Sequence, residues 1–570
     1  MSTTSDGFAS VSERLPGGLT AGHALFAVVT LVWAALYLIG LGDLSLRVWD
    51  ESRYATPARF MAEGGGWLDP MIRVPTHETA LGESLRLNKP PLGYWLQATA
   101  MTVFGVTEFA VRLPAALATL GCAAVVYRIG VRTDGRRAGF AGALLFLAFP
   151  GMLLGSHGGR TASLDPLLAL FGSLFVWLTW RGREDPRLLV PAGVAAGLAV
   201  LVKGMAAGVF VIVLLPVGAI YIQSYLTRWT AGAVASTVVV ALPWHLYAYL
   251  EHGDTFLDEY FFTSVAARVQ GEATEPPAEP LVPFLNYPWI REAIGVFVPP
   301  YQYALPFFGT AAVLALAFAY WRLRDDGTPD RATLRLLVWW LLAVPLTFVL
   351  GGGNHAWYLL PMYLPGAVLL GQFVAGVADG RFGRRLDAAL AGSGVGRPGR
   401  FLARIRDRIP SAGAVRTGVA ERWGGTAGAA LYPVLCLVLV VALLPTYAGP
   451  LHEPYNDEQR EIGTAIAAEV PEDETVFVWL GPDGDTESIM SHARRTGGRC
   501  LDPVRDRPLR QRERRRPPCS RGRRGTDEQR HLRRVHRRDD GLTDWNRGHR
   551  YGSRPSAATS ERPLASAPIR

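Results

Sequence analysis

Two neighbouring carboxylates mark the first segment of this 570-residue chain whose side chains could do chemistry. Asp50 and Glu51 stand directly before Arg53 and Tyr54 in the run Trp-Asp-Glu-Ser-Arg-Tyr. A carboxylate in such company can take a proton from a hydroxyl or an amine, or bind a cation. An isolated Asp-Glu pair is more often part of a solvated turn, because charged side chains are rarely buried. Both interpretations stay open at this point.

Lysine is almost absent from the chain. Only Lys89 and Lys203 occur among its 58 Lys and Arg residues. The ammonium of lysine is a compact point charge that suits a phosphate group, whereas arginine presents a planar fork. Lys89 stands before the helix-breaking pair Pro90-Pro91. We predict that both lysines bind a phosphate, although Lys89 could also be an ordinary lysine reaching from an apolar segment to water.

Three further segments place polar residues beside apolar runs. Arg160 and Asp165 precede one such run, where Asp165 is either a functional carboxylate or the N-cap of a helix. Arg268 lies in a mostly acidic stretch. His355 and Tyr358 open another apolar run, in which a lone histidine is more often structural than functional.

Long uncharged runs must position these residues. Hydrophobic residues make up 49% of the chain, and many runs reach the roughly 18 residues that a membrane-spanning helix needs. We therefore predict an all-α polytopic membrane protein with about 11 spans. Buried helices of a large soluble protein would explain one or two such runs, but not this many. The predicted spans are 23–42, 110–130, 138–155, 164–181, 189–202, 205–223, 229–250, 297–321, 333–351, 357–377 and 428–447. The apolar run 91–104 is too short to span and is predicted to lie at the membrane surface.

The distribution of arginine orients the spans. With residues 1–22 in the cytoplasm, the Arg-rich loops, including 379–427, also face the cytoplasm, as positively charged loops do. The loops 43–109 and 251–296 then face outward. On this topology the candidate residues from distant segments all gather at the outer face of the transmembrane domain, 23–447.

The C-terminal part changes character twice. Residues 448–491 begin like a small α/β domain outside the membrane and do not complete it. Residues 492–570 are rich in Arg, Pro and Gly, a composition typical of disorder or of a gene read out of frame. The spacing of the four cysteines indicates neither a disulfide framework nor a zinc site.

The motifs together resemble a known family. Asp-Glu-Ser-Arg-Tyr-Ala from Asp50, Asn-Lys-Pro-Pro-Leu-Gly-Tyr-Trp from Asn88, Arg-Thr-Ala-Ser-Leu-Asp from Arg160, Val-Lys-Gly around Lys203 and His-Ala-Trp-Tyr-Leu-Leu-Pro from His355 are similar to the aminoarabinose lipid A transferases. More broadly they resemble the dolichyl-phosphate-mannose protein mannosyltransferase superfamily. The similarity covers roughly residues 20–450 and implies the GT-C glycosyltransferase fold, with amphipathic surface helices in the first outer loop.

The resemblance implies an inverting transfer of a pentose or hexose from undecaprenyl or dolichyl phosphate to a lipid, glycan or protein, outside the cytoplasm and with no nucleic acid involved. Asp50 would be the catalytic base. The implied catalytic residues are Asp50, Glu51 and Asp165. The implied ligands of the donor phosphate are Lys89, Lys203 and Arg268. The implied substrate-binding residues are Arg53, Tyr54, Arg160, His355 and Tyr358.

One position departs from the family pattern. The aminoarabinose transferases usually have a glutamate before Lys-Pro-Pro that is implicated in metal binding, and here Asn88 takes its place. Asparagine is neutral and a poorer ligand, so no cofactor is predicted firmly and a divalent metal stays an open question.

Two other classes of protein remain alternatives. A polytopic transporter or flippase would share the spans, but we expect it to show inverted repeats and charges near the middle of the bilayer, neither of which the sequence displays. A catalytically inactive relative would be expected to lack Asp50, Lys89 or Asp165.

Overall fold

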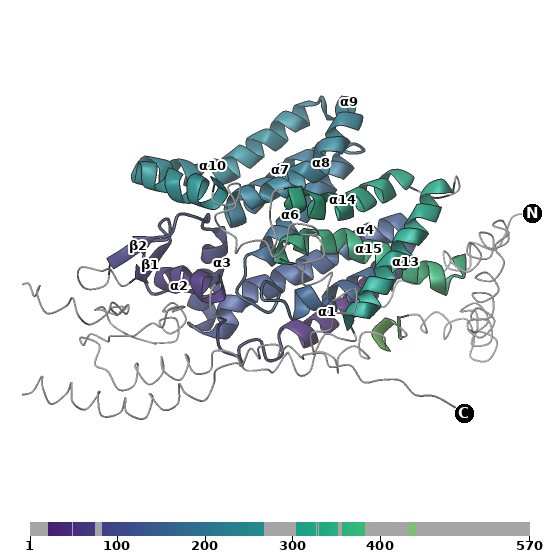
Figure 1. The fold of residues 1–570 in the computed structure, drawn as a ribbon, viewed down its shortest axis with the longest axis horizontal. Helices are drawn as coiled ribbons and strands as arrows, with labels where there is room; N and C mark the ends of the chain where they lie inside the picture. Colours follow the sequence, from purple (N-terminus) through teal and green to yellow (C-terminus); the bar gives the residue numbers. More distant parts are fainter. Residues whose placement is uncertain are drawn as a thin grey trace, which may run out of the picture. The chain divides into compact units, whose positions relative to one another are not determined.

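The computed structural model describes residues 21–47, 50–74, 82–266, 304–325, 328, 330–350, 356–381, 433–434 and 436–438. Helices dominate these residues (Figure 1). The longer ones are α1 (Ala21–Tyr37), α4 (Glu108–Leu147), α6 (Asp165–Gly182), α7 (Leu189–Lys203), α8 (Gly208–Ile220), α10 (Arg228–Leu257), α13 (Ala304–Arg324), α14 (Arg331–Leu350) and α15 (Leu360–Ala378). The short ones are α5 (Pro150–Leu153), α9 (Ile222–Tyr225), η2 (Pro186–Leu188), η3 (Gly204–Ala207), η4 (Asp258–Ala266) and η6 (Ala356–Leu359).

The predicted first outer loop folds into its own small layer. It contains α2 (Asp50–Ala62), an antiparallel pair of strands, β1 (Met71–Val74) and β2 (Gly82–Leu85), and α3 (Leu92–Phe104). These elements lie together at one end of the long helices, on the left in Figure 1. The sequence analysis predicted the helix at 91–104 and missed the strand pair, whose segments are too short to show a period.

The long helix α4 is the centre of the bundle. It packs against α1, α3, α6 and α15. Thr107 caps it, because the Thr107 hydroxyl accepts a hydrogen bond from the Ala110 N–H at 3.2 Å. The helix is kinked where Asp134 and Gly135 leave helical geometry, and this kink separates the two spans predicted at 110–130 and 138–155.

A break between α7 and α8 fixes the position of Lys203. Gly204 has a positive φ of 57°, which a side chain rarely adopts, and it ends α7 directly after Lys203. A Cβ at Gly204 would lie 2.6 Å from the Tyr260 hydroxyl, so the close approach of η4 also requires glycine here. Lys203 thus lies at the carboxyl end of a helix, where a positive charge is favourable.

The helix α10 fastens the outer layer to the bundle. Trp244 donates from Nε1 to the Leu68 carbonyl at 2.9 Å. Tyr247 donates to Asp69 at 2.9 Å, and His252 lies 2.8 Å from the same carboxylate. These contacts hold the segment after α2 against α10.

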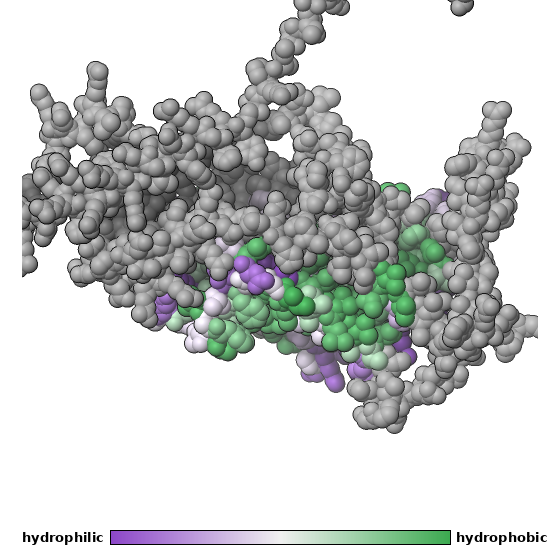
Figure 2. Space-filling view, turned by 90° about the horizontal axis from the view of Figure 1, so that it is seen from below, coloured by the Kyte–Doolittle hydropathy of each residue, from purple (hydrophilic) through white to green (hydrophobic). Residues whose placement is uncertain are grey.

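Five helical stretches of the described residues are long and apolar enough to cross a membrane: Glu108–Leu147, Pro186–Ile220, Arg228–Phe262, Arg331–Phe348 and Trp357–Ala378. Hydrophobic residues also gather over much of the described surface in Figure 2, with hydrophilic residues along the margins. The mostly helical, multi-pass character is confirmed. The predicted span 428–447, apart from 433–434 and 436–438, and the segments 448–491 and 492–570 lie outside the described residues.

Candidate active site

A tight turn between α5 and α6 carries a histidine that the sequence analysis did not single out. The run Gly-Ser-His-Gly-Gly places His157 in this turn. The Gly159 N–H donates to the Met152 carbonyl at 2.7 Å, and a Cβ on Gly158 would lie 2.4 Å from the same oxygen. Glycine is therefore needed for the chain to pass so close, and the turn directs His157 into the interior, where it is 5% exposed.

Asp165 and Lys203 form a buried ion pair. The Lys203 ammonium donates to both carboxylate oxygens of Asp165, at 2.7 and 2.6 Å. The two side chains are 8% and 6% exposed. Ser163 also donates to Asp165, at 3.0 Å. The N-cap interpretation of Asp165 is wrong, because Leu164 occupies the N-cap position and the Asp165 side chain binds these partners instead.

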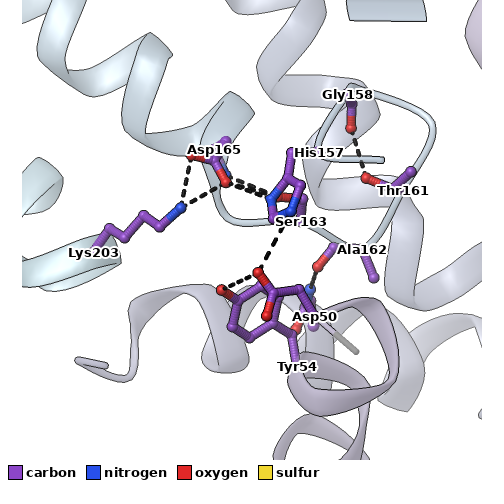
Figure 3. A network of polar contacts seen from close by, with 10 residues as sticks. Asp50, Tyr54, His157, Gly158, Thr161, Ala162, Ser163, Asp165 and Lys203 are labelled. Carbon is purple, nitrogen blue, oxygen red and sulfur yellow. Dashed lines mark hydrogen bonds and ion pairs between the residues drawn. The ribbon is translucent and has the colours of Figure 1, made fainter. Parts of the chain in front are cut away.

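His157 lies between this pair and Asp50 (Figure 3). Its Nδ1 is 3.0 Å from Asp165 Oδ2, and its Nε2 is 3.5 Å from Asp50 Oδ2. The ring stacks on Trp357, with 4.0 Å between centroids and 14° between planes. One connected network thus runs from Lys203 through Asp165 and His157 to Asp50.

Tyr54 completes the network on the far side of Asp50. One turn along α2, its hydroxyl makes a long hydrogen bond of 3.4 Å to Asp50 Oδ2. Burial, and then the charges of Asp50 and Asp165, raise the pKa of Tyr54 well above its usual value. The phenol therefore stays protonated and acts as a donor to the carboxylate.

Glu51 has a different position from its neighbour. Its carboxylate binds the Arg112 guanidinium, with 2.6 Å from Nε to Oε1, and also accepts from the backbone N–H groups of Arg47 and Ala162 at 2.7 and 2.8 Å. Burial raises the pKa of Glu51, but Arg112 and the two N–H donors outweigh burial and hold that pKa below its usual value. Glu51 is thus a buried anion in an ion pair, and its predicted catalytic role stays a prediction.

Arg160 binds backbone at the base of the outer layer, and its predicted role in binding substrate stays a prediction. Its guanidinium donates to the carbonyls of Leu36 and Ile39, at the carboxyl end of α1. It lines a small pocket together with Arg47 and Arg112. Because Arg47 and Arg112 likewise donate to backbone carbonyls, these three arginines fasten the start of the outer layer to the bundle.

Lys89 lies in the turn between β2 and α3, where its ammonium donates to the Asn88 carbonyl at 3.3 Å. The turn is tied to η4, because the Leu87 N–H donates to Glu259 at 2.7 Å. Arg53 is in α2, and its carbonyl accepts from Arg86 at 3.2 Å.

The residues at Asn88 do not fit a metal ion well. The Asn88 side-chain oxygen is buried without a hydrogen-bond partner in the described structure. It is neutral, however, and no group of three or more His, Cys, Asp or Glu side chains suited to a metal occurs among the described residues. A single amide oxygen is a weak ligand set for a divalent cation.

The aromatic segment before α15 contributes a residue that was not predicted. Tyr358 stacks on Phe348, with ring centroids 4.9 Å apart, whereas its neighbour Trp357 supports His157. His355 and Arg268, both predicted to bind substrate or phosphate, lie outside the described residues.

The comparisons with known proteins agree with the motifs. Residues 88–247 match the family model described as dolichyl-phosphate-mannose-protein mannosyltransferase. An undecaprenyl phosphate-alpha-4-amino-4-deoxy-L-arabinose arabinosyl transferase of Proteus mirabilis is 29% identical over 361 residues, which is 61% of this chain and 58% of the relative. One from Pseudomonas savastanoi is 31% identical, covering 60% of each chain. The chain is thus similar to the aminoarabinose transferases over about three fifths of its length and to the mannosyltransferase family model over residues 88–247.

A solved structure is similar to this chain in fold. The crystal structure of ArnT from Cupriavidus metallidurans bound to undecaprenyl phosphate covers 83% of this chain and 84% of its own, with a TM-score of 0.57 and 18% identity. At that identity the likeness shows the fold alone. The chain spans somewhat less than two thirds of the length of the transferases that it matches in sequence.

Proposed function

We propose that this protein transfers a sugar from a polyprenyl-phosphate donor to the hydroxyl or amine of an acceptor, with Asp50 as the base. One observation carries the proposal. The Asp50 side chain is 35% exposed, whereas His157, Asp165 and Lys203 behind it are only 5 to 8% exposed. A carboxylate that contacts buried polar side chains on one side and is exposed on the other is suited to take a proton from a bound molecule.

The substrate class comes from the relatives. Their names specify undecaprenyl phosphate as the carrier, and the matched region 88–247 includes Lys89, Asp165 and Lys203. The donor is an undecaprenyl- or dolichyl-phosphate pentose or hexose, and the acceptor a lipid, a glycan or a protein. The reaction takes place at the outer face of the membrane, as the arginine distribution predicts.

The transfer is a single displacement. Asp50 takes the acceptor's proton as the acceptor attacks the anomeric carbon, and the bond from that carbon to the phosphate oxygen breaks, so the configuration inverts. Negative charge grows on the departing phosphate, and fixed positive charges nearby stabilise the transition state. Lys89 and Arg268 supply such charges. Lys203 donates two N–H groups to Asp165 and has a third for the phosphate.

The position of the charged residues favours an enzyme over a transporter. Asp50 and Asp165 begin α2 and α6, and Lys203 ends α7. Asp50, the proposed base, thus belongs to the predicted outer loop 43–109 and to no predicted span, whereas a transport path needs charged groups near the middle of the bilayer.

Purified full-length protein in vesicles, supplied with a panel of undecaprenyl-phosphate sugars labelled in the sugar, tests the proposal. We expect label to leave the carrier and undecaprenyl phosphate to accumulate only when an acceptor is present. Movement of intact labelled donor across the vesicle membrane, with the sugar–phosphate bond preserved, would instead support a flippase.

A further inference from the structure

The imidazole of His157 is held between two carboxylates. Nδ1 faces Asp165 at 3.0 Å and Nε2 faces Asp50 at 3.5 Å (Figure 3). The stacked Trp357 from η6 covers one face of the ring, and Ser163 lies 3.2 Å from Nδ1. The ring is therefore fixed in plane and direction by groups on several different elements.

Hydrogen bonding sets the tautomer. Both ring nitrogens face carboxylates, which can only accept hydrogen bonds, but only Nδ1 lies within hydrogen-bond distance, 3.0 Å against 3.5 Å, so Nδ1 carries the hydrogen in the neutral ring. Nε2 then has a lone pair, directed at Asp50. A proton that arrives on Asp50 consequently has a base directly behind it.

The charges around the ring favour a proton on Nε2. Lys203 neutralises Asp165, and Tyr54 is uncharged, so Asp50 is the unbalanced charge of the network. When the acceptor's proton enters the site and settles on His157, an imidazolium lies between two carboxylates and Asp50 is charged again. Opposite charges at these distances stabilise that arrangement.

We propose that His157 accepts the proton that Asp50 takes from the acceptor; this inference rests on the proposed function. The acceptor's O–H or N–H bond breaks and Asp50 gains the proton. A half-turn of the carboxyl, whose terminal torsion is soft, brings that proton to Nε2, where a new N–H bond forms. The imidazolium releases the proton to water when the product leaves. A second proton acceptor is needed because bound substrates exclude the water that would otherwise take the proton from Asp50.

Two substitutions separate proton transfer from mere orientation. His157→Asn puts an amide near the position of Nδ1 and can keep the contact with Asp165. His157→Gln puts an amide near the position of Nε2, where it can hydrogen-bond Asp50 but cannot take a proton. His252→Asn is the matched control, because His252 also faces a carboxylate, that of Asp69 at 2.8 Å, away from this network.

The first measurement is the pH dependence of kcat for the full-length protein. An imidazole that is already protonated cannot accept another proton, so the wild-type rate should fall toward acid pH. Both His157 variants should lose this fall in rate toward acid pH. Their kcat should also be about 10- to 100-fold lower than that of wild type, a smaller loss than the roughly 10²–10⁴-fold expected when a primary base is removed. The control should keep the fall toward acid pH. Wild-type kcat and an unchanged fall toward acid pH in His157→Gln would overturn the proposal.

A second measurement does not depend on turnover. The Asp50 carboxyl band is isolated by subtracting the infrared spectrum of Asp50→Asn, and it is followed through a pH titration. We expect the band of wild type and the band of His157→Gln to respond differently to pH, because the variant lacks the imidazole that exchanges a proton with Asp50. Identical responses in the two proteins would contradict the proton-sharing pair. Different responses in a protein that transfers no sugar would support the pair and refute the proposed function.

Discussion

Glu51 and Arg112 form an ion pair in the interior, where the first turn of α2 meets the first turns of α4. Nε lies 2.6 Å from Oε1, and the side chains are 1% and 2% exposed. Arg112 also donates to three carbonyls of the segment before α2, those of Leu41, Leu44 and Ser45. Because Glu51 adjoins Asp50 in the chain, this pair fixes the start of the helix that presents the proposed base.

Glu51→Gln should destabilise the protein strongly. The substitution leaves the Arg112 guanidinium buried without its counter-charge, and breaking a buried pair in this way typically costs about 3–5 kcal/mol. Thermal unfolding in detergent measures the loss. Glu63→Gln is a suitable control, because the Arg59–Glu63 pair at the carboxyl end of α2 is partly exposed, and its loss should cost less than about 1 kcal/mol. Equal unfolding temperatures for the two variants would contradict the structural role of Glu51.

The same pair predicts how stability depends on pH. The pKa of Glu51 is lower in the folded protein than in the unfolded chain, where it is roughly 4.3. The unfolded state therefore takes up a proton first as the pH falls. The stabilisation by ionised Glu51 is complete above the unfolded pKa and is lost as the pH falls through the lower folded pKa. Unfolding temperatures between neutral and acid pH should fall more steeply for wild type than for Glu51→Gln, and parallel curves would argue against this linkage.

Asp165 and Lys203 should behave as a coupled unit. Lys203→Met leaves a buried carboxylate uncompensated and should cost more stability than the double variant Asp165→Asn/Lys203→Met, in which no charge is stranded. The interaction energy from the double-mutant cycle should fall in the range of about 0.5–3 kcal/mol. Lys89→Met serves as the control, since the Lys89 ammonium donates to a backbone carbonyl, that of Asn88, at 3.3 Å. Additive losses from Asp165→Asn and Lys203→Met would show that the pair is not coupled.

Lys89 should matter for donor use more than for folding. A charge-assisted contact to a phosphate is worth about 1.5–3 kcal/mol, so Lys89→Ala should lower kcat/KM for the donor by roughly 10- to 150-fold. Lys89→Arg should recover only part of this, because a planar fork poorly replaces a point charge on a tetrahedral phosphate. The measurement is kcat/KM for the donor in wild type and both variants at matched expression. Full activity of the arginine variant would show that the ammonium is not specifically needed.

The sequence predicted the helices and part of the network. Long uncharged runs are direct evidence of spanning helices, and the gap between the predicted spans 189–202 and 205–223 falls where α7 ends at Lys203. Asp165 and Lys203 were both assigned to one face of the protein from topology alone, and the structure brings them into contact. What topology could not give was their pairing, because two residues on one face can still lie far apart.

The missed residues were those whose role depends on a distant partner. Arg112 lies inside an apolar helix, where a charge is costly unless paired, so its position alone was a signal of a buried acid. His157 lies in a glycine-rich turn, and such a turn is a sign of close packing, but the sequence analysis did not single out this histidine. Trp357 is adjacent to the predicted Tyr358, and only the three-dimensional fold shows which of the two rings reaches the site.

The most direct test of the central claim uses Asp50→Asn, with donor binding and transfer measured on the same purified full-length protein. The amide keeps the shape of the side chain and removes the base. We predict that labelled donor binds with nearly unchanged affinity while the rate of sugar transfer falls by about 10²–10⁴-fold, the range typical for loss of a general base. A variant that retained more than half of the wild-type rate would show that Asp50 is a structural residue and that the proposed mechanism is wrong.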